Sequence, residues 1–531
     1  MKKMVIIFLG LLSLPVLAQK KPALVVGIVV DQMRYEYLNK FYDRYSDKGF
    51  KRLMIEGINC KDNHYNYAPT VTAAGHASVY TGTVPAVHGI VGNEWIEVSN
   101  GKKMYCTEDS TVQTVGSKSK AGMMSPKNLW TSTITDQLKM AQNYKSKTIA
   151  IALKDRGSIL PGGHTADAAY WYDSADGYWI SSSFYMKELP TWVQKFNSEG
   201  RPQKYMSKGW NTLYPIATYT RSAEDDSPFE SKLPGEKSPT FPHELKGGNA
   251  LEVIRTTPFG NTITKDFAIK AIEEENLGKS GTTDFLAISF SSTDYVGHSF
   301  GPQSIELEDT YLRLDQDIAD ILTHLDAKLG KNQYLIFLTA DHAVAEIPYY
   351  LQSKRLPGEV FDNVKAMNEA KMVLKKEFGD VEIIAGNDNY QIYLNQANLD
   401  RLQISKEAVG KVLEKSFKKQ PGFAELVSMR EAASSPIPSL YREMITNGYN
   451  QHRSGDFMYL LKPQWFSSSY KTGTTHSSLY AYDTHVPLLF FGWNVKPKEI
   501  NQRTNISDIS STLANWLKIN EPSGSIGKVI Q

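Results

Sequence analysis

Cysteine is nearly absent, because the 531-residue sequence contains only two, Cys60 and Cys106. Metal sites built from thiolate ligands are therefore excluded, and any transition metal must be bound by histidine and carboxylate side chains. In an oxidising compartment the two cysteines can form one disulfide, and the alternative is a pair of separate buried thiols. The sequence leaves both states open.

An excess of charge of one sign is also lacking. The 59 lysines and arginines nearly balance the 57 aspartates and glutamates, which gives a net charge of +2. A charge this small does not steer nucleic acid or an anionic membrane to the protein, so we expect no nucleic-acid partner.

The length exceeds the size at which one hydrophobic core usually stops growing, which predicts one large domain with insertions, or two domains.

Long hydrophobic runs are missing after the N-terminus, and the mature chain is expected to have no transmembrane span. The N-terminus itself, MKKMVIIFLGLLSLPVLAQKK, has a lysine pair, a short apolar run and small residues up to Ala18. This pattern predicts a signal peptide over residues 1–18 and a mature chain over 19–531. An anchor helix is the alternative, but Ser13 and Pro15 interrupt the run. We expect a monomer that is periplasmic or secreted.

Four apolar, β-branched runs indicate strands that are buried on both faces, as in a parallel sheet covered by helices. They span residues 23–30, 282–290, 333–340 and 485–492. Residues 263–277 and 306–329 have apolar positions at three- and four-residue steps, which predicts helices that directly precede strands. The alternation predicts an α/β fold with a central, largely parallel sheet between helices.

Two long segments lack this alternation. Residues 157–250 are rich in Gly, Pro, Ser, Tyr and Trp, and residues 343–475 mix Lys-rich helical pieces with short strand-like pieces. Both are interpreted as insertions at the carboxyl end of the sheet rather than as independent domains.

Carboxylates follow three of the predicted strands. Asp31 comes directly after the first, Asp294 and His298 follow the second, and Asp341 and His342 end the third. In open α/β sheets ligands bind beyond the carboxyl ends of the strands, so these side chains are expected to converge. Each alone is better explained as a helix cap or a hydrogen-bonded core residue, but the joint pattern favours a metal site.

Three aspartates close together raise each other's pKa values unless a cation neutralises them. Oxygen and imidazole ligands favour zinc, with manganese or iron as alternatives. His164, in a Gly-rich turn, is a further candidate, and His476 or His485 can complete the site, since spacing alone does not choose between them. His76 and His88 are expected to hold their loop by hydrogen bonds.

The motifs together resemble the alkaline phosphatase superfamily. They are DQMR after the first strand, YAPTVTAAGHASVYTGTVPAVHGIVGNEW, STDYVGHSFGP, TADHA and GTTHSSLYAYDTHVPLLFFG. Their order and spacing are similar to PafA-type, phosphate-irrepressible alkaline phosphatases and to the related nucleotide pyrophosphatase/phosphodiesterases. The resemblance covers nearly the whole mature chain.

The resemblance implies two zinc ions per chain. One would be held by Asp294, His298 and His476, and the other by Asp31, Asp341, His342 and the nucleophile, Thr72. His476 is selected because the last ligand of the family follows a Gly-Thr-Thr-like turn, which leaves His485 with a structural role.

The resemblance also implies the residues that contact substrate. Asn93 would contact a phosphoryl oxygen, and Lys154 and Arg156, in KDRG, would reach the phosphate. An exposed basic turn is the alternative for KDRG. A dianionic monoester offers one more anionic oxygen than a diester does, so the cation pair favours monoesters.

The expected activity is that of an exported zinc-dependent phosphate monoester hydrolase, an alkaline phosphatase. It would act on small-molecule phosphate esters through a phosphothreonine intermediate and release inorganic phosphate. The alternative on the same scaffold is a phosphodiesterase or nucleotide pyrophosphatase. A sulfatase is disfavoured because no Cys-x-Pro-x-Arg element occurs, and a non-enzymatic metal-binding protein is disfavoured by the complete set of predicted site residues.

Overall fold

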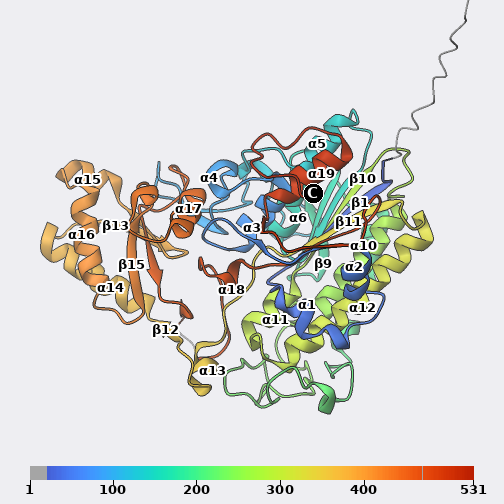
Figure 1. The fold of residues 1–531 in the computed structure, drawn as a ribbon, viewed down its shortest axis with the longest axis horizontal. Coiled ribbons are helices and arrows are strands. Elements are labelled where there is room, and N and C mark those ends of the chain that lie inside the picture. Colours follow the sequence, from blue (N-terminus) through green and yellow to red (C-terminus); the bar gives the residue numbers. More distant parts are fainter. Residues whose placement is uncertain (1–20, 469–470) are drawn as a thin grey trace, which may run out of the picture.

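Figure 1 shows the computed structural model of the chain, which describes residues 21–468 and 471–531. The predicted signal peptide, residues 1–18, lies outside the described residues. A ten-stranded sheet crosses the larger part of the molecule in the order β19-β2-β18-β11-β1-β10-β7-β8-β9-β6. Its two edge strands are β19 (Lys498–Ile500) and β6 (Thr114–Val115). Its central strands are β11 (Tyr334–Thr339), β1 (Leu24–Val30), β10 (Asp284–Phe290) and β7 (Thr148–Ala152).

These four strands are fully buried, as their continuous apolar sequences predict. β1 pairs in parallel with β10 and with β11, and β10 pairs in parallel with β7. In Figure 1, α3 (Thr72–Thr81), α6 (Arg156–Gly162) and α19 (Asp508–Leu517) lie on one side of the strands. The helices α10 (Phe259–Glu274) and α12 (Ile305–Leu329) lie on the other side, which confirms the α/β sandwich.

The last predicted strand differs in direction. β18 (Leu488–Gly492) begins three residues later than the run 485–492 and pairs with β11 in antiparallel orientation, so the sheet is mixed and mostly parallel. Because of this reversal, Leu488 lies beside Thr339, the last residue of β11. The chain that precedes β18 therefore enters the sheet at the edge where the parallel strands end.

The segment 157–250 contributes directly to the sheet. β8 (Ala168–Asp173) extends it in parallel from β7, and β9 (Tyr178–Ser182) pairs antiparallel with β8. The sequence AAYWYD does not predict a strand, because it is aromatic rather than β-branched. Part of this segment thus belongs to the central sheet instead of an insertion on its end.

The segment 343–475 forms a lobe beside the sheet, in yellow to orange in Figure 1. It has its own four-stranded sheet in the order β13-β14-β16-β15, covered by α14 (Asn363–Phe378) and α16 (Lys406–Phe417). The strands are Ile384–Asp388, Gln391–Leu394, Phe457–Leu461 and Phe423–Ser428 in that order. A cluster of buried apolar residues separate from the main core lies between them, so this insertion has a core of its own.

Both cysteines are buried free thiols. Cys60 ends β2 (Ile58–Cys60) in the main core, whereas Cys106 packs in a different apolar cluster. Burial raises the pKa of the Cys60 thiol to about 12. The disulfide alternative is thereby removed.

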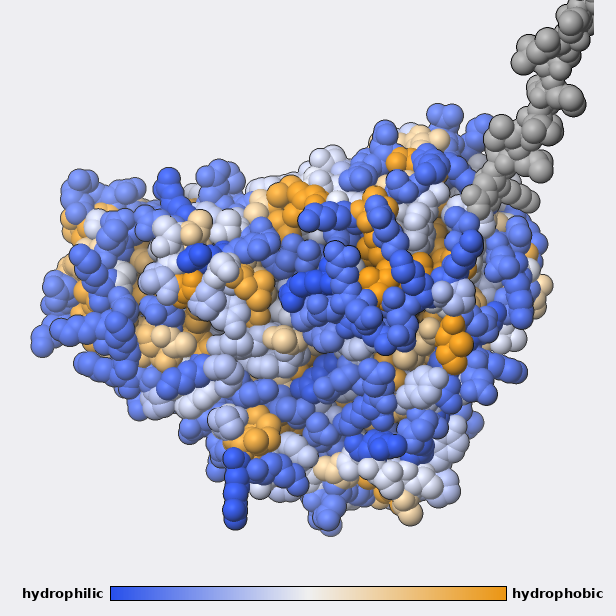
Figure 2. Space-filling view, viewed as in Figure 1, coloured by the Kyte–Doolittle hydropathy of each residue, from blue (hydrophilic) through white to orange (hydrophobic). Residues whose placement is uncertain are grey.

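No helix among the described residues is long and apolar enough to cross a bilayer. The face drawn in Figure 2 is largely hydrophilic, with apolar residues in small scattered patches.

Candidate active site

Asp31 and Asp341 meet at the carboxyl edge of the sheet because β1 and β11 are adjacent parallel strands that end just before them. The Nε2 atom of His342 lies 3.6 Å from Asp31 Oδ1 and 3.7 Å from Asp341 Oδ2. All three side chains are fully buried. These two carboxylate oxygens have no hydrogen-bond partner in the described part of the chain, so they are free to bind a cation.

Thr72 is the first residue of α3 and is 2% exposed. Its Oγ1 atom lies 3.4 Å from His342 Nε2, so the hydroxyl faces the same point as Asp31 and Asp341. Gly75 makes this approach possible, because a β-carbon there would lie 2.2 Å from the backbone oxygen of Asp341. The small residues of the TAAGHAS stretch thus let the start of α3 pack directly on the end of β11.

A second group lies next to the first. Asp294 and His298 are one turn apart on α11 (Ser292–Phe300), and His298 Nε2 is 3.1 Å from Asp294 Oδ1. His476 Nε2 lies 3.9 Å from the same oxygen. His342 belongs to both groups, because its ligand atom also lies close to those of Asp294 and His476. The structure therefore brings together all six Asp and His residues that the sequence analysis assigned to metal.

The hydrogen bonds of the three histidines orient them as ligands. In each, Nδ1 faces a backbone carbonyl, which can only accept, so Nδ1 carries the proton and Nε2 presents a lone pair. The contacts are His298 to Thr474 at 2.8 Å, His342 to Ala343 at 3.0 Å and His476 to Thr70 at 2.7 Å. Burial lowers the pKa of His342 to about 4, which keeps it neutral. This donor set fits zinc.

The charge balance also calls for cations. Burial and the neighbouring Asp31 raise the pKa of Asp341 well above its ordinary value. The ammonium group of Lys154 donates to Asp31 Oδ2 at 2.7 Å and to Asp294 Oδ2 at 2.6 Å. One ammonium group does not neutralise three buried carboxylates, so divalent ions fit this site.

Two of the three predicted phosphate contacts touch the site directly, because Lys154 donates to Asp31 and Asp294 and Asn93 contacts the backbone of Ala73, next to Thr72. Lys154 follows β7 and is only 4% exposed, which argues against an exposed basic turn. Arg156 begins α6, and its buried Nε has no partner among the described residues. Asn93 Oδ1 accepts from the Ala73 backbone N–H at 2.9 Å, so its amide NH2 is the group that it can offer to a ligand.

Gln32 is a site residue that the sequence analysis did not single out. Its Nε2 donates to Asp294 Oδ1 at 2.6 Å and its backbone N–H donates to Asp341 Oδ1 at 3.1 Å. The residue has a φ of 65°, an uncommon conformation for a side chain of this size. Its position after Asp31 in DQMR was the available signal.

Three further histidines form hydrogen bonds outside the two groups. His76 Nδ1 donates to the backbone oxygen of Thr72 at 2.9 Å, and His88 Nε2 lies 2.9 Å from Ser78 Oγ, so both hold α3 as expected. His164 contacts Asp136 and the backbone oxygen of Leu129 instead of the site.

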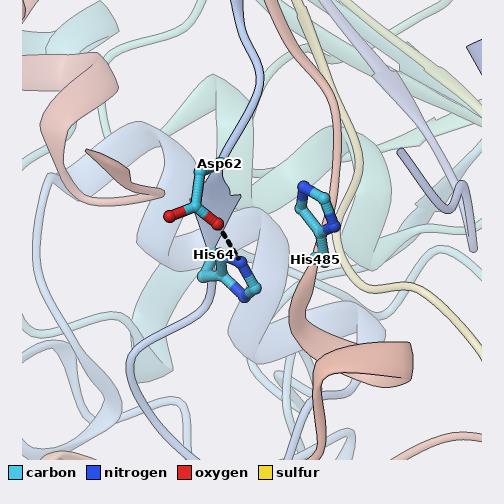
Figure 3. Close-up of side chains that lie close together, drawn as sticks. All are labelled: Asp62, His64 and His485. Atoms are coloured by element: carbon cyan, nitrogen blue, oxygen red, sulfur yellow. Dashed lines mark hydrogen bonds and ion pairs between the residues drawn. The ribbon is translucent and has the colours of Figure 1, made fainter. Parts of the chain in front are cut away.

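A third group of possible ligands, Asp62, His64 and His485, is drawn in Figure 3. The two imidazoles are stacked, with ring centroids 4.6 Å apart and planes at 7°. His64 already contacts Asp62 and Thr484, and His485 Nε2 contacts the backbone oxygen of Lys61. These hydrogen bonds give the group a structural role, which agrees with the role expected for His485.

The fold and the site define a class of metal-dependent hydrolase, in which a mostly parallel sheet carries two adjoining Asp/His groups beside a buried threonine. The family model described as type I phosphodiesterase/nucleotide pyrophosphatase matches residues 25–486, and the chain belongs to this family.

Within the family, the chain is similar to alkaline phosphatases over nearly its full length. It is 46% identical to PafA of Elizabethkingia meningoseptica, with 97% of this chain and 94% of the relative covered. It is also 46% identical to PhoV of Synechococcus elongatus, with 96% and 92% covered. A relative from Myroides odoratus named calcium-transporting ATPase is 50% identical, with 96% and 94% covered.

The solved structure of wild-type PafA matches with a TM-score of 0.94 and covers 97% of this chain and 99% of PafA. A second PafA structure, with a TM-score of 0.93, is a variant in which a threonine is replaced by serine, and an asparagine, a lysine and an arginine by alanine.

Proposed function

We propose that this chain, an alkaline phosphatase by its homology to PafA and PhoV, hydrolyses phosphate monoesters through a phosphothreonine at Thr72. The observation that carries the proposal is the placement of the Thr72 hydroxyl. It lies 3.4 Å from His342 Nε2, at the point where both Asp/His groups meet.

The two groups are proposed to hold two Zn2+ ions. Asp31, Asp341, His342 and Thr72 would bind one, and Asp294, His298 and His476 the other. When bound, zinc supplies Lewis-acid chemistry, which lowers the pKa of an oxygen ligand and stabilises negative charge on phosphoryl oxygens.

The reaction consists of two displacements at phosphorus. Thr72 Oγ1 forms a bond to phosphorus and loses its proton, while the bond to the leaving-group oxygen breaks and the alcohol departs with a proton. Water then attacks the phosphothreonine and gives up a proton, the bond between phosphorus and Oγ1 breaks, Oγ1 takes up a proton, and inorganic phosphate leaves. Two inversions give net retention at phosphorus.

Three side chains are proposed to bind the non-bridging oxygens. The Asn93 amide, the Lys154 ammonium and the Arg156 guanidinium supply donors and positive charge, which phosphoryl transfer needs most from a protein. The substituted PafA variant supports this assignment. The four residues substituted in that variant are a threonine, an asparagine, a lysine and an arginine, in the same chain order as Thr72, Asn93, Lys154 and Arg156. The number of residues from the threonine to the asparagine, and from the lysine to the arginine, is the same in both proteins.

A comparison of ester types tests the proposal. kcat/KM is measured for a nitrophenyl phosphate monoester and for its methyl diester, in wild type and in the Lys154→Ala/Arg156→Ala variant. The monoester value should fall by about two orders of magnitude or more, and the diester value should change little, since a diester lacks the second anionic charge. The matched control is Lys139→Ala, which removes another buried lysine. Lys139 is ion-paired with Asp167.

Two results of this assay would change the assignment. An unaffected monoester rate in the double variant excludes the two cations from phosphate binding. A wild-type preference for the diester would instead favour the phosphodiesterase activity that the family model describes. ATP belongs among the substrates, because its terminal phosphate is dianionic like a monoester and the Myroides odoratus relative is named an ATPase.

Export is proposed from the sequence of residues 1–18, with cleavage after Ala18 and a periplasmic or secreted mature chain. The native protein should begin at Gln19 when its N-terminus is sequenced, and deletion of residues 2–18 should retain the protein in the cytoplasm. An intact N-terminus on protein recovered from the cell envelope would favour the anchor-helix alternative.

A further inference from the structure

A short hairpin lies beside the proposed phosphate contacts. Its strands are β4 (Glu94–Ile96), which directly follows Asn93, and β5 (Lys103–Tyr105). They pair antiparallel, with Glu94 opposite Tyr105, and the Cys106 backbone N–H donates to the Asn93 backbone oxygen at 3.0 Å. One hairpin therefore fixes Asn93 and Tyr105 relative to each other.

Asp155 lies between Lys154 and Arg156, at the N-cap position of α6. Aspartate at this position usually caps the helix, but the Asp155 side chain makes no cap hydrogen bond. Its Oδ1 instead accepts from the Tyr105 hydroxyl at 2.8 Å, and its Oδ2 accepts from the Thr107 hydroxyl at 2.5 Å. The carboxylate is thus held by the chain that leaves the hairpin rather than by its own helix.

The Tyr105 hydroxyl also contacts Arg156. Its single proton goes to the Asp155 carboxylate, which leaves a lone pair for the Arg156 guanidinium, and the NH1 group donates to it at 3.0 Å. An arginine side chain has many rotamers, and fixing one of them before substrate binds removes part of the entropic cost of binding. With NH1 engaged, Arg156 still has its unpartnered Nε to offer to an oxyanion.

We propose that Tyr105 is a positioning residue for the hydrolytic reaction. Together with Asp155 and Thr107 it holds the Arg156 guanidinium in the orientation that binds the phosphoryl group. Because Tyr105 and Asn93 belong to one hairpin, the two phosphate contacts are aligned as a unit. This inference rests on the proposed function, in which Arg156 binds phosphate.

A double-mutant cycle tests the inference with the monoester substrate. Tyr105→Phe keeps the ring and removes the hydroxyl, and it should lower kcat/KM about tenfold in the wild-type background. In the Arg156→Ala background the same change should have less than a twofold effect, because no guanidinium remains to be oriented. The diester rate should stay the same, and inorganic phosphate should inhibit Tyr105→Phe about tenfold more weakly than wild type.

Tyr172→Phe is the matched control, since its hydroxyl donates to the backbone oxygen of Leu251 and not to Asp155. It should leave monoester kinetics and phosphate inhibition unchanged. Equal losses from Tyr105→Phe in both backgrounds, or an equal loss for the diester, would overturn the positioning role, because a general structural defect acts on both. An unchanged rate in Tyr105→Phe would overturn it as well.

The two proposals fail in different ways. If Arg156→Ala alone leaves monoester hydrolysis and phosphate inhibition unchanged, the assignment of Arg156 to phosphate is wrong and the proposed function is revised. If Arg156→Ala lowers the rate but Tyr105→Phe does not, only the positioning role of Tyr105 is wrong.

Discussion

The Oγ1 atom of Thr72 lies 3.4 Å from the Nε2 atom of His342, although 270 residues separate them in the sequence. The contact exists because the start of α3 packs on the end of β11. It places the hydroxyl proposed as nucleophile beside His342, which among the described residues is the histidine that belongs to both ligand groups.

Substitution of Thr72 tests whether its hydroxyl is the nucleophile. Thr72→Ala should lower monoester kcat by several orders of magnitude, because no other side chain is proposed to carry the phosphoryl group. Thr72→Ser retains a primary hydroxyl and should keep most of the activity. Acid quenching with labelled monoester should trap a covalent phosphoprotein in wild type and in Thr72→Ser but not in Thr72→Ala. Normal turnover by Thr72→Ala would exclude Thr72 as the nucleophile.

His342 should control metal binding more than any other single ligand, because it contacts both groups. Purified wild type should contain about two equivalents of zinc, and His342→Ala should lose most of it after dialysis. His485→Ala is the matched control, since that histidine belongs to the stacked pair in Figure 3. Elemental analysis decides the point, and equal metal content in the two variants would contradict the ligand assignment.

The sequence predicts the part of the site that follows strands. Asp31 and Asp341 come directly after continuous apolar runs, and such runs show where a parallel strand ends even when its neighbours are unknown. The spacing of Asp294 and His298 places them on one helix face. These signals are local, so single-sequence reasoning can use them.

Contacts made by long-range pairing cannot be predicted in this way. An apolar run has no direction, so the reversal of β18 relative to β11 was not visible. Tyr105 reaches Asp155 only because the β4–β5 hairpin folds back beside α6, and nothing in KDRG indicates that contact. The aromatic β8 strand was missed since its residues do not follow the β-branched pattern of the other central strands.

Gly75 should be intolerant of a side chain. Gly75→Ala gains about 1 kcal/mol of helix propensity, but its methyl would lie 2.2 Å from the Asp341 backbone oxygen, and overpacking costs about 1–3 kcal/mol. The balance predicts lower thermal stability, together with weaker metal binding because Asp341 must move. Gly162→Ala in α6, whose methyl would meet no atom closer than 3.3 Å, is the control. A Gly75→Ala protein as stable and metal-rich as wild type would contradict this packing.

His88 should make the fold sensitive to acid. Burial lowers its pKa from 6.5 to about 3, and its Nδ1 accepts from the Ile90 backbone N–H at 3.1 Å, which protonation would prevent. Between these two pH values the unfolded chain binds the proton and the folded chain does not. The stability that neutral His88 contributes is therefore complete above pH 6.5 and is lost as the pH falls toward 3.

The non-titrating variant His88→Asn isolates this contribution. The difference in unfolding free energy between wild type and His88→Asn should shrink by ~2 kcal/mol from pH 7 to pH 5, at ~1.4 kcal/mol per pH unit below 6.5. Urea unfolding of the metal-loaded proteins at the two pH values measures this difference in unfolding free energy. Since other acid-sensitive groups are common to both proteins, their effects cancel. A difference that does not change with pH would show that folding does not lower the pKa of His88.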